Sequence, residues 1–99
     1  MLLLQIDFPY NGPTGDEMAE GFKDLAYSIA KENGLIWKIW TENKETKEAG
    51  GVYMFENLPD LQRYLDMHTK RLESFGVTDI RAKIFGVNEK LSAITKAPL

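Results

Sequence analysis

Residues 35–56 read LIWKIWTENKETKEAGGVYMFE, and this stretch predicts a β-hairpin. The part from about Leu35 to Asn43 is rich in Ile and Trp, which suit a pleated surface. The part from about Glu48 to Glu56 has the same character and predicts a second strand. Between them, the polar run Lys44–Lys47 is typical of the turn that joins two paired strands.

A strand and a helix are predicted before the hairpin. Residues 2–8 alternate as in a strand, with Leu2, Leu4, Ile6 and Phe8 on one face and Leu3, Gln5 and Asp7 on the other. Thr14 and Glu17 have the spacing of a capping box, and a helix is expected from there to about Lys31. Gly34 suits the left-handed position that ends a helix. The apolar stripe of this helix consists of Met18, Phe22, Leu25 and Ile29.

A second helix and a fourth strand are predicted after the hairpin. Asn57 and Asp60 can cap the helix, and Gly76 ends it. The stripe of this helix consists of Leu58, Leu61, Leu65, His68, Leu72 and Phe75. The last strand is expected over about residues 78–87, and the tail that follows has one helical turn near residues 91–94.

The resulting order βαββαβ is the ferredoxin-like pattern. The preference for right-handed crossovers places the first and third strands in the centre, parallel to each other, with both helices on one face. The predicted fold class is therefore α+β, ferredoxin-like, with a four-stranded antiparallel sheet. Residues 1–99 are expected to form a single domain, since domains of roughly 100 residues are common.

The composition excludes several classes of protein. The chain has no cysteine, which removes disulfides, thiolate metal sites and a cysteine nucleophile. Its N-terminus lacks the pattern of a signal peptide, and no apolar run approaches the roughly 18 residues of a membrane span. We therefore expect a cytoplasmic protein without a membrane partner. The net charge of −3 and the scattered basic residues predict no nucleic-acid partner.

Both faces of the predicted sheet are apolar. In the second strand Leu35, Trp37 and Ile39 oppose Ile36 and Trp40, and in the third Tyr53 and Phe55 oppose Val52 and Met54. Strands that are apolar on both faces are buried on both faces, whereas the two helices cover only one. A second copy of the chain is the simplest cover for the other face, so a homodimer is expected.

His68 is the only histidine and lies in the middle of the apolar stripe of the second predicted helix. It is expected to point at the sheet, where a buried imidazole needs a hydrogen-bond partner, and Asp7 and Gln5 are candidates. One interpretation is a structural histidine, and the other is a group that exchanges a proton near neutral pH. A single histidine without cysteines predicts no metal site.

Three aromatic side chains, Trp37, Trp40 and Tyr53, lie close together on the predicted hairpin. Aromatic residues fill cores, but they also line pockets for flat ligands. Gly50–Gly51 is interpreted as a bulge where the hairpin turns, or as space left for a ligand beside Tyr53. Tyr10–Asn11 leaves the first strand in a loop, which is either a plain turn or part of a binding site.

Several blocks of sequence carry a family resemblance. They are Phe8–Pro13 with Gly15–Asp16 and Met18–Glu20, then Trp37–Glu42, Glu48–Tyr53, Tyr64–Leu72, and Ala82–Glu89 with Leu91–Ser92. Together these blocks resemble the YdhR-type putative mono-oxygenases. The resemblance covers essentially the whole chain, with no evident insertion.

That resemblance implies a dimeric α+β barrel, as in the antibiotic-biosynthesis mono-oxygenases. In that fold two ferredoxin-like sheets face each other, and each subunit keeps a pocket between its helices and its sheet. Some relatives oxidise polycyclic phenols with oxygen and without metal or flavin, and others are isomerases, cyclases or haem-degrading enzymes. The haem-degrading relatives combine Asn, Trp and His, whereas Gln5, Asp7 and Tyr53 occupy the first two of those places here. This departure argues against haem degradation.

The resemblance and the residues together predict a cofactor-independent mono-oxygenase for a small phenolic or quinone-like compound. His68 is expected to be the catalytic base that accepts the phenol proton. The expected substrate-binding residues are Trp37, Trp40, Tyr53, Tyr10, Asn11 and Tyr64. A non-catalytic dimeric protein that binds a small aromatic ligand, and a cofactor-free isomerase or cyclase, are the alternatives.

Overall fold

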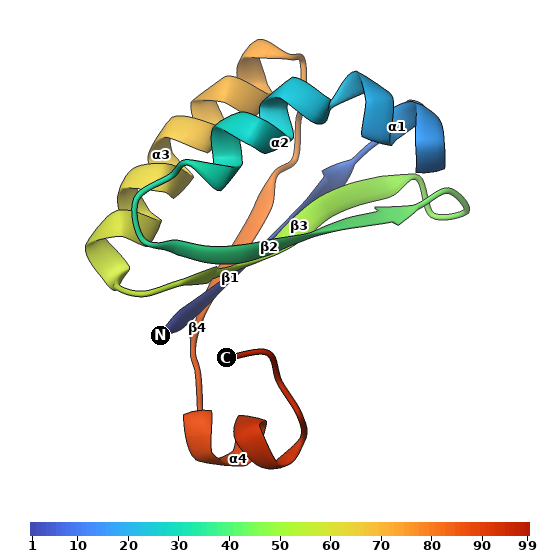
Figure 1. Cartoon of the computed structure of the whole chain (residues 1–99). Helices are drawn as coiled ribbons and strands as arrows, with labels where there is room; N and C mark the ends of the chain where they lie inside the picture. Colours follow the sequence, from blue (N-terminus) through green and yellow to red (C-terminus); the bar gives the residue numbers. More distant parts are fainter.

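The computed structural model describes residues 1–99, and its elements follow the predicted order (Figure 1). They are β1 (Leu2–Pro9), α1 (Gly15–Gly21), α2 (Lys23–Ala30), β2 (Leu35–Asn43), β3 (Glu48–Phe55), α3 (Leu58–Ser74), β4 (Arg81–Gly86) and α4 (Glu89–Ile94). The polar run after β2 forms the expected turn, in which Asn43 Oδ1 accepts the backbone N–H groups of Glu45 and Thr46 at 3.1 and 3.0 Å.

The four strands form one sheet in the order β2-β3-β1-β4, and every neighbouring pair is antiparallel. The helices α1, α2 and α3 all lie on one face of this sheet (Figure 1). This is the predicted α+β ferredoxin-like fold. The prediction that the two central strands run parallel is wrong: the helical crossover makes β1 and β2 parallel, and the hairpin then reverses β3.

The first predicted helix is in fact two helices. α1 and α2 meet at Phe22, which leaves helical geometry with φ −106° and ψ 14°. The predicted capping box is also wrong, because the side chain of Thr14 makes no cap hydrogen bond. Glu42 of β2 acts as the hydrogen-bond acceptor instead. Both carboxylate oxygens of Glu42 lie 3.1 Å from the backbone N of Gly15 and share its hydrogen. The acceptor for the start of α1 therefore comes from another element of the fold.

The long helix α3 begins and ends as its sequence predicts. Asn57 Oδ1 accepts the backbone N–H of Asp60 at 2.9 Å, which is an N-cap bond. Gly76 follows the helix in the left-handed region, with φ 87°. The fourth strand is shorter than predicted, because the chain turns at Asp79 with φ 52° and pairing with β1 begins only at Arg81.

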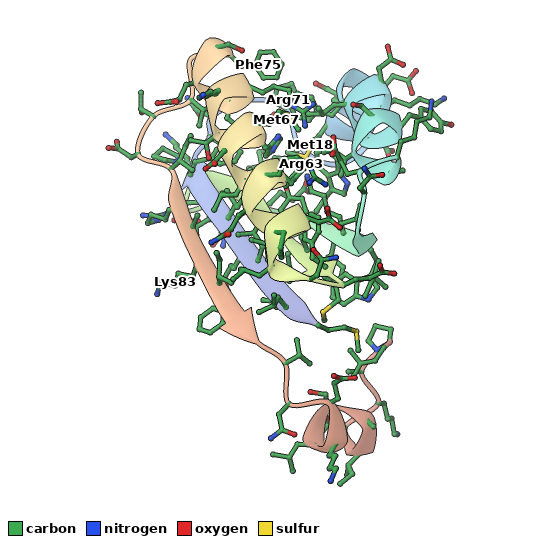
Figure 2. All side chains as sticks on the ribbon, turned by 90° about the vertical axis from the view of Figure 1, so that its left-hand side faces the viewer. Met18, Arg63, Met67, Arg71, Phe75 and Lys83 are labelled. Carbon is green, nitrogen blue, oxygen red and sulfur yellow. The ribbon has the colours of Figure 1, made fainter.

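The core lies between these helices and the sheet. Its buried side chains come from β1, α2, β3 and α3, and they are Leu4, Ile6, Ile29, Tyr53, Phe55, Leu61, Tyr64 and Leu72. Figure 2 shows Arg71 of α3 and Met18 of α1 in the region between their two helices. These helices do not close fully over the sheet, and a cavity remains between them.

A bulge near the start of β2 determines which of its side chains face the helices. The register shifts at Ile36, and beyond it Lys38 and Trp40 lie on the helix side while Trp37 lies on the other. The bulge expected at Gly50–Gly51 is wrong, because both glycines keep a regular register with the strands beside them.

The sheet face turned away from α1, α2 and α3, which we call the open face, has polar side chains, among them Gln5, Asp7, Arg81 and Lys83, as well as apolar ones. It carries Leu3, Trp37, Ile39, Val52, Met54 and Phe85. Ile39 and Phe85 are 53% and 48% exposed, which is high for large apolar side chains. The C-terminal tail returns to this face, where Trp37 Nε1 donates a hydrogen bond of 2.9 Å to the carbonyl of Pro98. No helix in the structure combines the length and the apolar character needed to cross a bilayer.

Candidate active site

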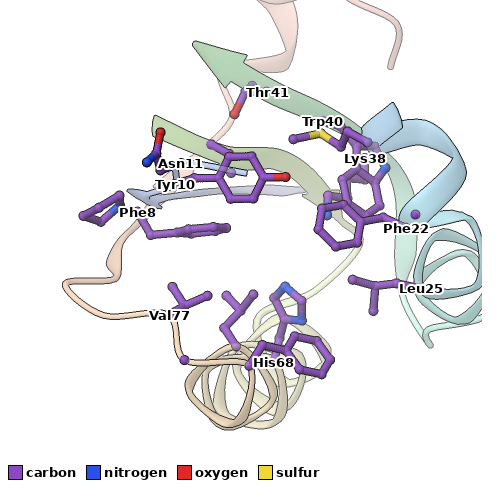
Figure 3. Close-up of a pocket in the computed structure, with 18 of the residues that line it drawn as sticks. Phe8, Tyr10, Asn11, Phe22, Leu25, Lys38, Trp40, Thr41, His68 and Val77 are labelled. Carbon is purple, nitrogen blue, oxygen red and sulfur yellow. The ribbon is translucent and has the colours of Figure 1, made fainter. Parts of the chain in front are cut away.

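A cavity of about 550 Å³ lies between α1, α3 and the sheet (Figure 3). This volume is in the roughly 300–1,000 Å³ range of small-molecule sites. The lining is mostly apolar and contains no Asp or Glu. It consists of Phe8, Pro9, Tyr10, Asn11, Met18, Gly21, Phe22, Leu25, Lys38, Trp40, Thr41, Ala49, Gly50, Tyr53, His68, Leu72, Phe75, Gly76 and Val77.

Aromatic rings form the wall of the cavity on the side of α1 and β2. Phe22, at the junction of α1 and α2, stacks on Trp40 with ring centroids 6.3 Å apart and planes 16° apart. The ring of Tyr10 lies 6.4 Å from that of Phe22, and its hydroxyl donates to the carbonyl of Pro13 at 2.5 Å. A flat ligand between these rings would therefore meet apolar carbon over most of its surface.

His68 enters the cavity from the middle of α3 and is only 3% exposed (Figure 3). Its Nδ1 accepts hydrogen bonds from Nε and Nη2 of Arg71, at 3.2 and 2.9 Å. Because an arginine can only donate, we assign the proton of the neutral ring to Nε2. Nε2 has no protein partner, yet no fully buried side-chain nitrogen lacks one, so this atom is open to the cavity.

The surroundings of His68 keep its ring neutral. Burial is the largest cause and the charges of Arg71 and Lys38 add to it, and together they lower the pKa of His68 from 6.5 to about 3. An imidazole with so low a pKa is a weak base. The geometry therefore favours hydrogen-bond donation through Nε2 over the proton acceptance that the sequence suggested.

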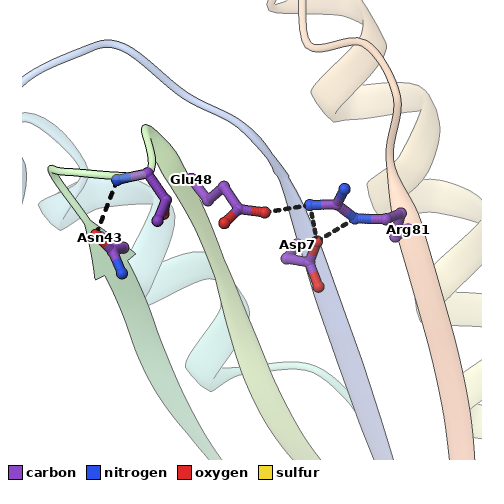
Figure 4. A network of polar contacts seen from close by, with 5 residues as sticks. Asp7, Asn43, Glu48 and Arg81 are labelled. Carbon is purple, nitrogen blue, oxygen red and sulfur yellow. Dashed lines mark hydrogen bonds and ion pairs between the residues drawn. The ribbon is translucent and has the colours of Figure 1, made fainter.

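The partners expected for His68 on β1 are wrong. Gln5 and Asp7 point to the open face, since side chains alternate along β1 and His68 faces the side of Leu4 and Ile6. Asp7 instead accepts a hydrogen bond from Arg81 of β4 (Figure 4). The same guanidinium reaches Glu48 at 2.5 Å, so this network links three strands away from the cavity.

Lys38 brings a second basic group into the cavity. Its Nζ lies 3.3 Å from the ring centroid of Trp40 and 4.7 Å from that of Tyr53. Burial and, less strongly, the charge of Arg71 lower the pKa of Lys38 from 10.5 to about 7. Neither Lys38 nor Arg71 forms an ion pair with a carboxylate. The site therefore holds positive charge without a protein counter-ion.

Two tyrosines, Tyr53 and Tyr64, pack beside His68 and are hydrogen-bonded to each other. The hydroxyl of Tyr64 donates to that of Tyr53 at 3.3 Å, and Tyr64 stacks on His68 with centroids 5.0 Å apart. Burial is the main cause that raises the pKa of Tyr53 to about 12, and it also raises the pKa of Tyr64. Both phenols are therefore neutral at ordinary pH and act as hydrogen-bonding groups.

The structure brings together most of the residues that the sequence singled out. The cavity lining includes His68, Trp40, Tyr53, Tyr10 and Asn11. It does not include two others. Trp37 lies on the open face and is bonded to the tail, and Tyr64 lies behind His68, where it contacts that ring and not the cavity.

Sequence reasoning missed Lys38, Arg71 and Phe22. A signal for Lys38 was present, because it lies two residues before Trp40 and therefore on the same face of a strand. Arg71 follows His68 by three residues, which places both on one side of a helix. Nothing in the sequence pointed to Phe22 as a wall, because its place depends on the break between α1 and α2.

No group of three or more His, Cys, Asp or Glu side chains is arranged to hold a metal ion. Apart from the amide oxygen of Asn11, the polar side-chain atoms of the cavity are nitrogens and hydroxyls, and none is a carboxylate that would favour a cation. The model of the family described as putative mono-oxygenase ydhR matches residues 3–98.

This chain belongs to the YdhR family. Its fold is also that of solved structures with little sequence identity to it. A putative antibiotic biosynthesis monooxygenase from Deinococcus radiodurans matches with a TM-score of 0.60 and 16% identity, over 89% of this chain and 93% of that one. A point mutant of SnoaB, a cofactor-independent oxygenase from Streptomyces nogalater, matches with 0.62 and 13%, over 88% and 92%.

A third structure, the structural-genomics protein YJCS, matches the YdhR-family chain with a TM-score of 0.58 and 17% identity, over 87% of this chain and 99% of that one. Identities this low show a shared fold and no more. No curated protein matches the chain in sequence. Family membership thus classes the protein with the putative mono-oxygenases, and the substrate has to be argued from the cavity.

Proposed function

We propose that this protein is a cofactor-independent mono-oxygenase that acts on a small phenolic or quinone-like aromatic compound. One observation carries the proposal: an aromatic-lined cavity of about 550 Å³ whose charged lining is cationic and contains no carboxylate. Such a lining stabilises an electron-rich phenolate, which passes electrons to oxygen more readily than a phenol does. Membership in the YdhR family and the fold shared with a cofactor-independent oxygenase support the same reaction class.

The roles within the site follow from its contacts. Trp40, Phe22 and Tyr53 hold the flat ring of the substrate by apolar contact. His68 Nε2 donates a hydrogen bond to the substrate oxygen, and Arg71 on Nδ1 keeps the ring in the donating tautomer. Without a bound cofactor, the substrate itself supplies the electrons that reduce the second oxygen atom to water.

Oxygen consumption with a panel of hydroquinones tests the reaction class. The purified protein, dialysed against a chelator and free of flavin absorbance, is expected to consume oxygen with at least one panel member and to release an oxidised product. A binding signal by calorimetry with no turnover would support the binding-protein alternative instead. Conversion of the compound without oxygen uptake would support an isomerase or cyclase, and either result would contradict the proposal.

We also propose that two copies of the chain associate through their open faces. The support for this is the exposure of Ile39 and Phe85 on that face, opposite α1, α2 and α3. Light scattering at micromolar concentration is expected to give twice the chain mass of 11.3 kDa. Replacing both residues with Ser should shift the mass towards the monomer, and a monomer mass for the unmodified protein would contradict the association.

A further inference from the structure

The charge of the cavity is one-sided. Lys38 is the only charged residue of its lining, and a second cation, Arg71, lies behind the lining, where it is bonded to Nδ1 of His68. The nearest carboxylate on the same face of β2 is Glu42, which accepts the hydrogen bond from Gly15 at the start of α1. Because no carboxylate of the protein neutralises these cations, the site favours a ligand that carries a negative charge.

The backbone makes room for Lys38 to lie in the cavity. A Cβ atom at Gly51 would lie 2.6 Å from Cε of Lys38, so the missing side chain is the space that the lysine stem occupies. The stem passes over Gly51 and the amine ends above Trp40, 3.3 Å from the ring centroid. Figure 3 shows both side chains at the edge of the cavity, across from His68.

The amine of Lys38 is free to react. It makes no hydrogen bond to a protein atom, and it lies over the ring of Trp40 and near that of Tyr53. No fully buried side-chain nitrogen lacks a partner, so Nζ is in contact with the cavity. A partly desolvated amine beside a second cation loses its proton more easily than a lysine in water, as the direction of its pKa shift shows.

We propose that the neutral amine of Lys38 is the base that removes the phenol proton, and that the cavity holds its substrate as the phenolate between Lys38 and His68. This assignment rests on the proposed function and names the ionised phenol as its substrate form. In the step, the O–H bond of the phenol breaks, an N–H bond forms on Nζ, and the electron pair stays on the phenolate oxygen. The new ammonium then pairs with that oxygen, while Nε2–H of His68 donates to it.

The other groups that face Lys38 agree with this assignment. From β3 it faces Tyr53, whose pKa is raised to about 12, so this group stays a neutral phenol and does not compete with the amine as a base. From α3 it faces His68, which stays neutral, and the guanidinium of Arg71, which can only donate hydrogen bonds. The hydroxyl of Tyr10 donates a hydrogen bond to the carbonyl of Pro13 in its own loop, and α1 and α2 present only apolar side chains to the cavity.

The experiment uses para-nitrophenol, whose phenolate is yellow and whose neutral form is nearly colourless. It is added about one pH unit below its solution pKa, where roughly a tenth is ionised. The wild-type protein is expected to turn the bound compound yellow, which corresponds to a preference for the phenolate of tenfold or more. In Lys38→Met the yellow of the bound compound should be lost. The matched control Lys44→Met, in the exposed hairpin turn, should keep it.

A second variant separates charge from proton acceptance. Lys38→Arg keeps a cation that cannot act as a base, so bound nitrophenol should stay yellow. With a turnover substrate, kcat/KM of the wild type should rise with pH through about 7, because only the neutral amine takes the proton. In Lys38→Arg that rise should move to the solution pKa of the substrate itself.

Three results would overturn the assignment. They are nitrophenol bound in its colourless form, nitrophenol that does not bind, and a yellow complex that persists in Lys38→Met. None of them depends on oxygen uptake, so a protein that ionises phenols and consumes no oxygen would support the role of Lys38 and contradict only the proposed oxygenase reaction.

Discussion

Replacing His68 with Phe is expected to lower kcat for a phenolic substrate by about 10²- to 10³-fold, the usual effect of losing one donor to a developing oxyanion. The phenyl ring keeps the volume and the stacking on Tyr64, but it lacks the Nε2–H that faces the cavity. Ligand affinity should fall much less, because most of the binding surface is apolar. Oxygen uptake gives kcat, and calorimetry with a non-reacting analogue gives the affinity.

His68→Gln is the matched control, because its side-chain amide keeps an N–H donor that reaches the cavity. It should recover part of the rate that His68→Phe loses. If both variants turned over as fast as the wild type, His68 would be a packing residue and its role in the reaction would be refuted.

A comparison of the wild type with His68→Phe also measures what His68 contributes to stability, apart from its role in the reaction. In the folded state the pKa of His68 is lowered from 6.5 to about 3. Between these two pH values His68 is therefore protonated in the unfolded chain and neutral in the folded one. The wild type should therefore lose stability as pH falls from 6.5 towards 3, on the order of 1–3 kcal/mol from this group after screening by solvent. His68→Phe should lack that component in urea titrations across the same range.

Gly50→Ala is expected to cost roughly 3 kcal/mol or more of unfolding free energy, and it is the most damaging conservative change that we foresee. A Cβ atom at this position would lie 1.9 Å from the carbonyl oxygen of Ile6 in β1, and backbone atoms on both sides hold that oxygen in place. The pairing of β1 with β3 would have to open, and that pairing is the centre of the sheet.

Gly86→Ala provides the control for this change. Gly86 also lies in a strand and pairs with Leu2, but nothing lies within 4 Å of where its Cβ would be. Its stability should stay within about 0.5 kcal/mol of the wild type. Chemical denaturation measures both variants, and equal stability of the two would show that β1 and β3 tolerate a wider separation at Gly50.

The order of elements could be read from the sequence because local signals determine it. The period of two in residues 2–8, the N-cap at Asn57 and the glycine after α3 depend only on neighbours along the chain. The break at Phe22 and the cap that Glu42 provides for α1 could not be read in this way. Both depend on residues that approach from β2, more than 15 positions away.

The candidate site was predictable in part, and its errors have a common cause. Strand alternation alone separates Trp37 from Trp40 and Asp7 from the side of His68, so aromatic or acidic character does not by itself place a residue in the site. A lysine such as Lys38 is hard to predict in a cavity because lysines are usually solvated. Its place in the cavity requires both the bulge at Ile36 and the empty space above Gly51, which only the folded sheet brings together.

The two tryptophans lie on opposite faces of the sheet, so their fluorescence reports on two different surroundings. Trp40 has the ammonium of Lys38 against its indole face, so its emission responds to the charge of that amine and to whatever enters the cavity. Trp37 is bonded to the tail on the opposite side and responds to what covers the open face. With one of the two replaced by Phe, the emission of the other reports separately on a ligand in the cavity or on a second copy of the chain.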